Sequence, residues 1–343
     1  MTLRIRLAAL AGVVVLALVA AGFYVLRVQR DQASAAGSAP AVPVTDLAAA
    51  LTAPHIVFRS TALGSGYGKL AVAPLTAPDG PRAFTEASCE RAYAVAGRSV
   101  CLSARRGLTN TYKAHVLGPD WAATGDLPLT GLPSRVRLSR DGALAVTTTF
   151  VYGDSYASLG QFSTRTVVTR IGHKGSSDLE TFRLLVDGKR ITAADRNFWG
   201  VTFADDDRFY ATAASGGKTW LVRGSLAQKR LDSIRTDVEC PSLSPDGTRI
   251  AFKKHGGMAP GHWRLAVYDL RTGVETELAE TRSVDDQAEW LDDKTVLYGL
   301  PRDGATGAAT SDIWATPADG AGPPRVLVPD AWSPAVVRTS SPR

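Results

Sequence analysis

The sequence predicts an all-β protein: a six-bladed β-propeller of four-stranded antiparallel blades, preceded by one N-terminal transmembrane helix. Three observations predict it. A strand–turn–strand unit recurs along the chain, a third and a fourth strand follow most copies, and the last apolar segment supplies the strand that the first copy lacks. A ring of such units closes on itself and leaves no long unpaired sheet edge.

The N-terminal segment 1–30 is expected to be a signal anchor. From Leu7 to Leu26 the chain has no charged residue, and a helix of this length crosses a hydrocarbon core of about 30 Å. The alternative is a cleaved signal peptide, whose apolar region is usually about 7–15 residues long. We favour the uncleaved anchor because Arg27 and Arg30 follow the run directly. The arginines on the two sides of the run are nearly balanced and do not fix its orientation alone; we expect the remainder of the chain outside the cytoplasm, because a short N-terminus with two arginines behaves like the start of a signal sequence.

Residues 31–54 are rich in alanine, serine, glycine and proline, which is the composition of a flexible linker. The propeller is expected from His55 to residue 338, and residues 339–343 form a tail. The 39 basic and 33 acidic residues are mixed along the chain. A nucleic-acid-binding protein concentrates its basic residues in a patch or stripe, so we expect no nucleic-acid partner.

The best copy of the repeat is 240–252, and 133–147 matches it well; 91–102, 198–212 and 287–298 are degenerate copies. The hairpin turns are expected at Gly97, Gly142, Asp206, Gly247 and Asp293, which lie 45, 64, 41 and 46 residues apart. A four-stranded propeller blade takes about 40–45 residues. The spacing therefore predicts one blade per unit, with an insertion in the longest interval.

Two of these turns carry an Asp-Gly pair, Asp141-Gly142 and Asp246-Gly247. Glycine accepts a positive φ angle, and the aspartate side chain can bind nearby backbone N–H groups. These four residues are therefore predicted to be structural.

The outer strands and the termini complete the count. Strands at 263–270 and 274–278 follow the best copy, and strands at 312–316 and 325–328 follow the last one. Near the start, 55–60, 69–73 and 82–84 look like the second, third and fourth strands of a blade without a first strand. The segment 332–337 is expected to enter this blade and close the ring.

The stretch Ser244-Pro-Asp-Gly-Thr-Arg-Ile-Ala-Phe252, followed by strand 265–270 and Thr272-Gly273, resembles the WD-like repeat of the TolB C-terminal propeller. The resemblance implies a six-bladed propeller that works outside the cytoplasm by binding partners. Two departures matter: the chain leaves no room for the α/β domain that precedes the TolB propeller, and TolB is a soluble periplasmic protein whereas this chain looks tethered.

Cys89 and Cys101 are candidates for a disulfide across the first full hairpin. A turn near Gly97 would place Cys101 opposite residue 94, so the bridge requires a bulge or a bent entry loop. The alternative that they do not pair stays open. Cys240 is expected to be a buried residue at a strand entry, since nothing next to it in the sequence suggests thiolate activation.

We predict no catalytic, cofactor or metal site. The five histidines lack metal-ligand spacing, and the aspartate runs fall mostly on predicted turns. No nucleophile elbow and no phosphate-binding loop opening a helix is recognised. A pair of carboxylates from different blades would be invisible to linear spacing, so a glycan-active enzyme remains the alternative.

Two groups of residues are candidates for recognition. One is an irregular polar loop in the longest blade, although we favour an ordinary long hairpin as its explanation; its residues are Tyr152, Asp154, Tyr156, Phe162 and Arg165. The other leads into two innermost strands and would rim the central channel, where structural caps also occur; its residues are Asp195, Arg196, Asn197, Asp285 and Asp286.

The expected function is that of a non-enzymatic, single-pass membrane protein whose extracytoplasmic propeller is an interaction scaffold in the cell envelope. Its partner would be an unidentified envelope protein or glycan, and we expect a monomer without cofactors. The alternative is a carbohydrate-binding protein or glycan-active enzyme with its site at the channel mouth. An enzyme would show converging carboxylates, histidine or arginine with perturbed pKa values there, whereas a scaffold would show a broad mixed or aromatic patch.

Overall fold

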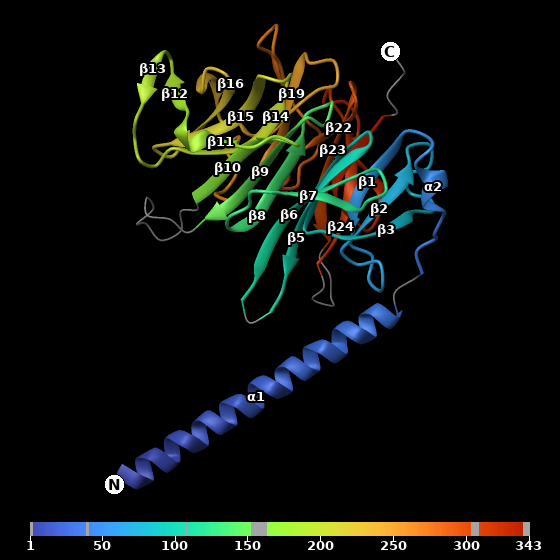
Figure 1. Cartoon of the computed structure of the whole chain (residues 1–343), viewed down its shortest axis with the longest axis vertical. Coiled ribbons are helices and arrows are strands. Elements are labelled where there is room, and N and C mark those ends of the chain that lie inside the picture. The colour runs from blue at the N-terminus through green and yellow to red at the C-terminus, as the bar shows by residue number, and fades with distance from the viewer. Residues whose placement is uncertain (1–2, 39–40, 108, 152–162, 303–308, 339–343) are drawn as a thin grey trace.

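The computed structural model of the chain describes residues 3–38, 41–107, 109–151, 163–302 and 309–338. Six sheets are arranged around a centre, and one long helix, α1 (Leu3–Ser38), lies outside them (Figure 1). Each sheet is one blade, and its first strand faces the centre. The predicted six-bladed β-propeller with an N-terminal apolar helix is confirmed.

The blades are numbered from the N-terminal side. Blade 1 contains β26 (Ala331–Val337), β1 (His55–Ser60), β2 (Lys69–Pro74) and β3 (Ala83–Ser88). Blade 2 contains β4 (Arg91–Val95), β5 (Arg98–Arg105), β6 (Thr111–Leu117) and β7 (Ala123–Leu127). Blade 3 contains β8 (Leu132–Leu138), β9 (Leu144–Val151), β10 (Ser163–Arg170) and β11 (Ser176–Asp178).

Blade 4 contains β14 (Asn197–Phe203), β15 (Arg208–Ser215), β16 (Lys218–Ser225) and β17 (Arg230–Thr236), and two further strands extend it. Blade 5 contains β18 (Glu239–Leu243), β19 (Arg249–Lys254), β20 (Arg264–Asp269) and β21 (Glu275–Glu277). Blade 6 contains β22 (Glu289–Asp292), β23 (Thr295–Arg302), β24 (Thr310–Pro317) and β25 (Arg325–Val328).

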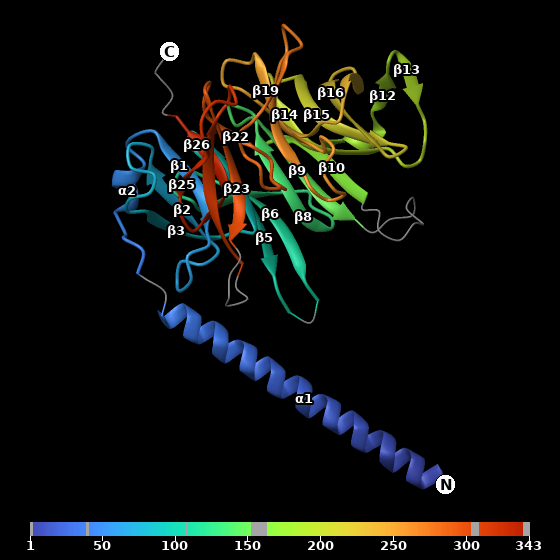
Figure 2. The ribbon, with the colours of Figure 1, turned by 180° about the vertical axis from the view of Figure 1, so that it is seen from behind.

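The C-terminal strand closes the ring as predicted. Strand β26 pairs antiparallel with β1, with Val337 opposite His55 and Ala331 opposite Ser60, and Figure 2 shows the two side by side. The innermost strands then contact one another in sequence around the whole ring, ending with β22 against β26. A sheet shared between both ends of the domain removes two free edges at once.

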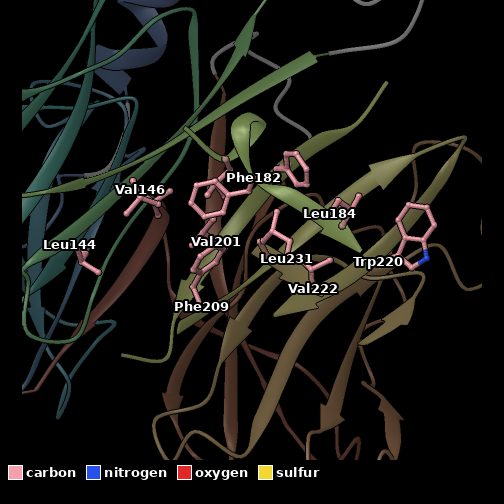
Figure 3. Packing of buried hydrophobic residues seen from close by; sticks show 14 residues of the cluster. Leu144, Val146, Phe182, Leu184, Val201, Phe209, Trp220, Val222 and Leu231 are labelled. Atoms are coloured by element: carbon pink, nitrogen blue, oxygen red, sulfur yellow. The ribbon is translucent and has the colours of Figure 1, made fainter. Parts of the chain in front are cut away.

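The core lies between neighbouring blades. Buried apolar clusters lie at all six blade-to-blade contacts, and the largest joins blades 3 and 4. In it, Val146 of β9 packs with Val201 and Phe209 of blade 4 (Figure 3). Because each blade buries both faces of its sheet, most of its central strand positions are apolar.

The insertion predicted in the longest interval is a short 3₁₀ turn, η1 (Leu179–Thr181), followed by the hairpin of β12 (Arg183–Val186) and β13 (Lys189–Ile191). Strand β12 pairs parallel with β17 and so extends blade 4 to six strands. Phe182 and Leu184 of this insertion enter the cluster between blades 3 and 4 (Figure 3).

The segment expected to be a linker is partly folded. Helix α1 continues to Ser38, since its alanine-rich end favours helix. From Pro43 the chain is docked on blade 1: the backbone of Arg82 bonds both Pro43 and Thr45. The short helix α2 (Leu47–Ala50), capped by Asp46, then buries Ala50. The span 31–54 is therefore not flexible throughout, because its apolar residues cover blade 1.

Helix α1 contains the stretch Leu10–Arg30, with a mean hydropathy of 2.2 and no buried share. By length and composition this helix could cross a membrane.

Candidate binding site at the channel mouth

The two ends of the central channel differ. We call the end where the innermost strands begin the upper mouth, and the end where they finish the lower mouth. Two adjoining cavities of about 570 and 550 Å³ open at the upper mouth, and both are lined by Arg91 and Leu132. The first takes residues mainly from blades 1, 2 and 6, the second mainly from blades 3, 4 and 5. The upper mouth is thus built by the whole ring.

Positive charge prevails among the residues that line these cavities. The carboxylates are Glu90, Glu239 and Asp285, and the cations are Arg59, Arg91, Arg106, Arg135 and Lys253. Aromatic side chains stand between the charges, namely Tyr67, Tyr112, Phe150, Trp199, Trp263 and Trp332.

Two arginines lie side by side where the cavities meet. Arg91 approaches Asp286 at 3.4 Å and stacks over the Trp332 ring at 5.0 Å. Burial, followed by the neighbouring positive charge of Arg135, lowers the pKa of Arg91 to about 10. Arg135 approaches the Asp285 carboxylate at 3.7 Å, and its Nε has no hydrogen-bond partner among the described residues. The positive charge here is only loosely compensated, because neither contact is a close bidentate pair.

Lys253 and Trp263 form a neighbouring part of the wall, where Lys253 shares the Asp285 carboxylate with Arg135. The Lys253 ammonium is 3.9 Å from the centroid of the Trp263 ring and is paired with Asp285. The Trp263 indole donates a hydrogen bond of 2.9 Å to Glu239. A flat ring beside ion-paired polar groups is thereby held rigid at the edge of the cavity.

Strand bulges aim three of these side chains at the upper mouth. Gly200, Cys240 and Ser333 have positive φ angles of 64°, 49° and 57° in three innermost strands, and the pairing register shifts at each place. The residue before each of them is Trp199, Glu239 or Trp332, and all three line the cavities. A bulge rotates the strand locally and re-aims its side chains.

A buried network of polar side chains joins the innermost strands below these cavities. Arg137 of β8 pairs with Glu289 at 3.1 Å and donates to the Ser242 hydroxyl and to the Ala288 carbonyl. Its guanidinium also lies over the Tyr93 ring at 4.9 Å. These groups come from blades 2, 3, 5 and 6 and tie the ring together across its centre.

The five predicted rim residues do not lie together in the structure. Asp285 lines the upper mouth, and the adjacent Asp286 holds Arg91 and accepts the Gly299 N–H. Asp195 instead caps the β15–β16 hairpin, accepting from the Ser215 hydroxyl at 2.6 Å. Hydrogen bonding to that hydroxyl lowers the pKa of Asp195.

The remaining two rim residues also make structural contacts. Asn197 is buried and accepts from the Thr164 backbone, which joins blade 4 to blade 3. Arg196 donates to the Ala193 carbonyl in its own turn. Asp195, Arg196 and Asn197 thus each make a structural contact, and none of them is among the residues described as lining the two cavities.

In the predicted recognition loop, Tyr152, Asp154, Tyr156 and Phe162 lie outside the described residues. Arg165 lies on β10 and its Nε donates to Asp178 at 2.9 Å. That bond ties it to the outer strand of its own blade.

The three cysteines are all buried. Cys89 and Cys101 form a disulfide, with Cα atoms 5.4 Å apart. Cys101 pairs with Ala92 rather than with residue 94, because the two-residue turn lies one position earlier than expected, at 96–97, and Cys89 reaches Cys101 from the bent entry before β4. Burial raises the pKa of the Cys240 thiol, which disfavours the thiolate.

Sequence reasoning missed Arg91, Arg135, Lys253, Trp199 and Trp263. For two of them the repeat itself was a usable signal. Arg91 and Trp199 stand at or near the start of repeat copies, where the innermost strands begin. The bulges that aim them have no such signal. Among the described residues, no three histidine, cysteine or acidic side chains are grouped to hold a metal ion.

No protein-family model matches the sequence, and no curated protein matches it. Among solved structures, TolB from Acinetobacter baumannii is similar, with a TM-score of 0.55 and 16% identity over 82% of this chain. The match spans 66% of that TolB chain, slightly less than two thirds.

Two further structures are more distant. A putative TolB from Agrobacterium tumefaciens has a TM-score of 0.48 and 10% identity, over 83% of this chain and 98% of its own. A puromycin-hydrolyzing peptidase from Mycobacterium tuberculosis has a TM-score of 0.48 and 12% identity, over 84% of this chain and 45% of the peptidase chain. The ring of six blades closed by its C-terminal strand, together with the likeness to the Acinetobacter protein, gives this chain the TolB-like six-bladed β-propeller fold.

Proposed function

We propose that the chain is a membrane-tethered, non-enzymatic scaffold of the cell envelope that binds another envelope component at the upper mouth. The observation that carries the proposal is the pair of adjoining cavities, to which all six blades contribute and in which five cations face three carboxylates. The partner that fits this chemistry presents acidic and apolar groups together. Loosely compensated arginines attract such a partner and orient it.

The tether and the compartment rest on two features. Helix α1 is long and apolar enough to cross a membrane. The disulfide between Cys89 and Cys101 suits an oxidising compartment, where such bonds persist. Together they favour a propeller outside the cytoplasm, anchored by its N-terminal helix.

The binding surface includes one exposed apolar residue at its centre. Leu132 is 46% exposed and lines both cavities. An apolar centre within a charged and aromatic rim is the usual composition of a protein interface. This favours a protein partner.

The second candidate is a glycan ligand, bound or processed. Trp263 and Trp199 beside Glu239 and Asp285 form a flat aromatic surface next to polar groups, which suits a sugar ring. The depressed pKa of Arg91 is also a feature of catalytic sites. Against an enzyme, Asp285 is ion-paired with Lys253 and Glu239 accepts from Trp263, so neither is a free acid or base.

The test is site-specific photo-crosslinking of the full-length protein in intact cells. A photo-reactive phenylalanine at Leu132 is expected to give one discrete protein adduct. The same group at Ile234, which is 37% exposed on β17 of blade 4, is the control and is expected to give none. Failure at Leu132, or equal adducts at both positions, would overturn a scaffold acting through the upper mouth.

Charge-reversal variants test whether the positive charge of the cavity lining contributes to binding. Arg106→Glu changes a residue that lines the first cavity, whereas Lys113→Glu changes an exposed residue of the adjacent strand. The adduct should weaken with the first and persist with the second. If instead the purified full-length chain retains envelope glycan, and Trp263→Ala abolishes this retention, the glycan function replaces the scaffold.

A further inference from the structure

A separate cavity of about 290 Å³ lies between blades 1 and 2, toward the lower mouth. Its walls are mainly apolar, with Val57 and Val337 from blade 1, Ala94 from β4, and Leu51 at the end of α2. It shares no lining residue with the cavities of the upper mouth.

The cavity exists because facing side chains are small. Ala94 and Ser99 are cross-strand partners on β4 and β5, and both line it. Elsewhere the contacts between blades are filled by larger residues, as close-packed interiors require. A void at this contact calls for an explanation.

Two buried hydrogen-bonding groups in this cavity lack partners. Ser99 is 2% exposed, and its hydroxyl has no hydrogen bond within the described part of the chain. The Nε1–H of Trp121 is likewise buried without an acceptor there. An unsatisfied buried polar group costs about 1–3 kcal/mol, so a ligand or an ordered water that reached either group would be stabilised.

A third group supplies an acceptor. His55 is 7% exposed, and its Nδ1 lies 2.8 Å from the Ala53 carbonyl. A carbonyl can only accept, so Nδ1 carries the hydrogen and Nε2 keeps a lone pair. Burial lowers the pKa of His55, which keeps the ring neutral. The cavity therefore combines two donors with one acceptor.

The backbone holds the indole in an unusual conformation. Trp121 has a φ of 64°, in the left-handed region that costs a bulky residue about 1–3 kcal/mol. Its N–H donates to the Gly118 carbonyl, and the Gly118 N–H donates to the Ala122 carbonyl. This turn holds Trp121 at the cavity, where its ring forms one wall.

Among the lining residues described, one carries a charge. Arg98 lines the cavity, but its Nη1 donates to the Gly142 carbonyl at 2.7 Å. A cationic ligand would meet this like charge, and an anionic ligand would exchange its hydration for a single guanidinium in a mainly apolar cavity, so a neutral ligand suits the lining best.

We propose that this cavity binds a small neutral ring compound bearing a hydroxyl group. The ring packs against Val57, Ala94 and Val337. The hydroxyl oxygen accepts from both Trp121 and Ser99, and its hydrogen is donated to His55. The volume is near the lower limit of small-molecule sites, about 300 Å³. Leu51, at the end of α2, covers one side of the cavity. The bound ligand would therefore contact blade 1, blade 2 and the segment between α1 and blade 1.

The test uses phenol as the probe and the full-length chain in lipid nanodiscs, with ¹⁵N-labelled tryptophan. The chain has seven tryptophans, and the Trp121 indole signal is assigned by its loss in Trp121→Phe. Phenol is expected to shift this signal saturably. Benzene, which lacks the hydroxyl, and benzoate, which is charged, are expected to leave it unchanged at the same concentration.

Variants locate the effect. Ser99→Ala should weaken phenol binding about 2–10-fold, the range for one lost hydrogen bond. Ser60→Ala is the matched control, because Ser60 is also buried and its hydroxyl also lacks a partner among the described residues, but it lies outside this cavity. The proposal is overturned if phenol does not shift the Trp121 signal, which is the result expected for a cavity that holds only water. It is also overturned if benzene shifts the signal with the same saturation, or if both serine variants bind phenol equally well.

Discussion

The buried pair of Arg137 and Glu289 should be the most informative place to perturb the ring. Their side chains are 7% and 9% exposed and lie 3.1 Å apart. Arg137→Met keeps much of the volume and removes the charge, so Glu289 is left with the Tyr93 hydroxyl, at 3.3 Å, as its remaining side-chain bond. Removing one partner of a buried pair costs about 3–5 kcal/mol.

The double variant separates charge from packing. Glu289→Gln keeps an acceptor for Tyr93 and removes the negative charge. In Arg137→Met/Glu289→Gln no charge is left unpaired, so the loss should be smaller than the sum of the single losses by about 2 kcal/mol. Coupling energies between residues in one network are of this size.

The pH dependence has a definite sign. Burial raises the pKa of Glu289. Without Arg137 the group binds a proton more readily in the folded chain than in the unfolded chain. The free energy of unfolding of Arg137→Met should therefore fall as pH rises from about 5 to 8, because folding then requires either proton uptake or a buried charge.

Urea unfolding of the full-length chain in mild detergent, followed by tryptophan fluorescence at pH 5.5 and pH 8, measures all four proteins. Additive losses that are equal at both pH values would show that the two side chains do not interact, and the argument that they tie the blades together would be wrong.

Three further outcomes are expected. Burial raises the pKa of Glu180 to about 8 from an ordinary value of 4.5. As the pH rises between these two values, the free energy of unfolding should therefore fall by at most about 1.4 kcal/mol per pH unit. Thermal unfolding of Glu180→Gln should not show this pH dependence. Replacing Cys89 and Cys101 by serine should cost about 3 kcal/mol, since the bond joins residues separated by 12 positions; equal urea midpoints with and without the bond would contradict this. Gly200→Ala should lower the free energy of unfolding by more than about 2 kcal/mol, because the added Cβ would lie 2.6 Å from the backbone of β18. The control is Gly216→Ala, which also has a positive φ of 58° but open space around it, and which should lose about 1–2 kcal/mol. Similar melting temperatures for the two variants would show that the close approach at Gly200 has no effect.

The hairpin turns show what could be predicted locally. Asp141 accepts from the Ala143 N–H at 3.0 Å and Gly142 has a φ of 71°. Asp246 binds Thr248 in the same way, and Gly247 has a φ of 73°. These contacts join residues two positions apart, so the sequence contains all of the information they need.

The binding residues could not be predicted in the same way. Arg91 meets Asp286 across a separation of 195 residues, and Arg135 approaches Asp285 across the ring. Which strand position faces the channel depends on bulges at Gly200, Cys240 and Ser333, and two of those residues are not glycine. Neither relation follows a period along the chain.

The sequence by itself determined the number of blades, their turns, the closing strand and the apolar N-terminal helix, because alternating strands and Asp-Gly turns depend on neighbouring residues. The tertiary structure alone decided that residues 43–51 cover blade 1, that a hairpin extends blade 4, and that arginines and tryptophans gather at the upper mouth. It also decided where cavities remain. These features arise when side chains from distant blades meet, and their separation in space is set by the tilt and packing of whole sheets.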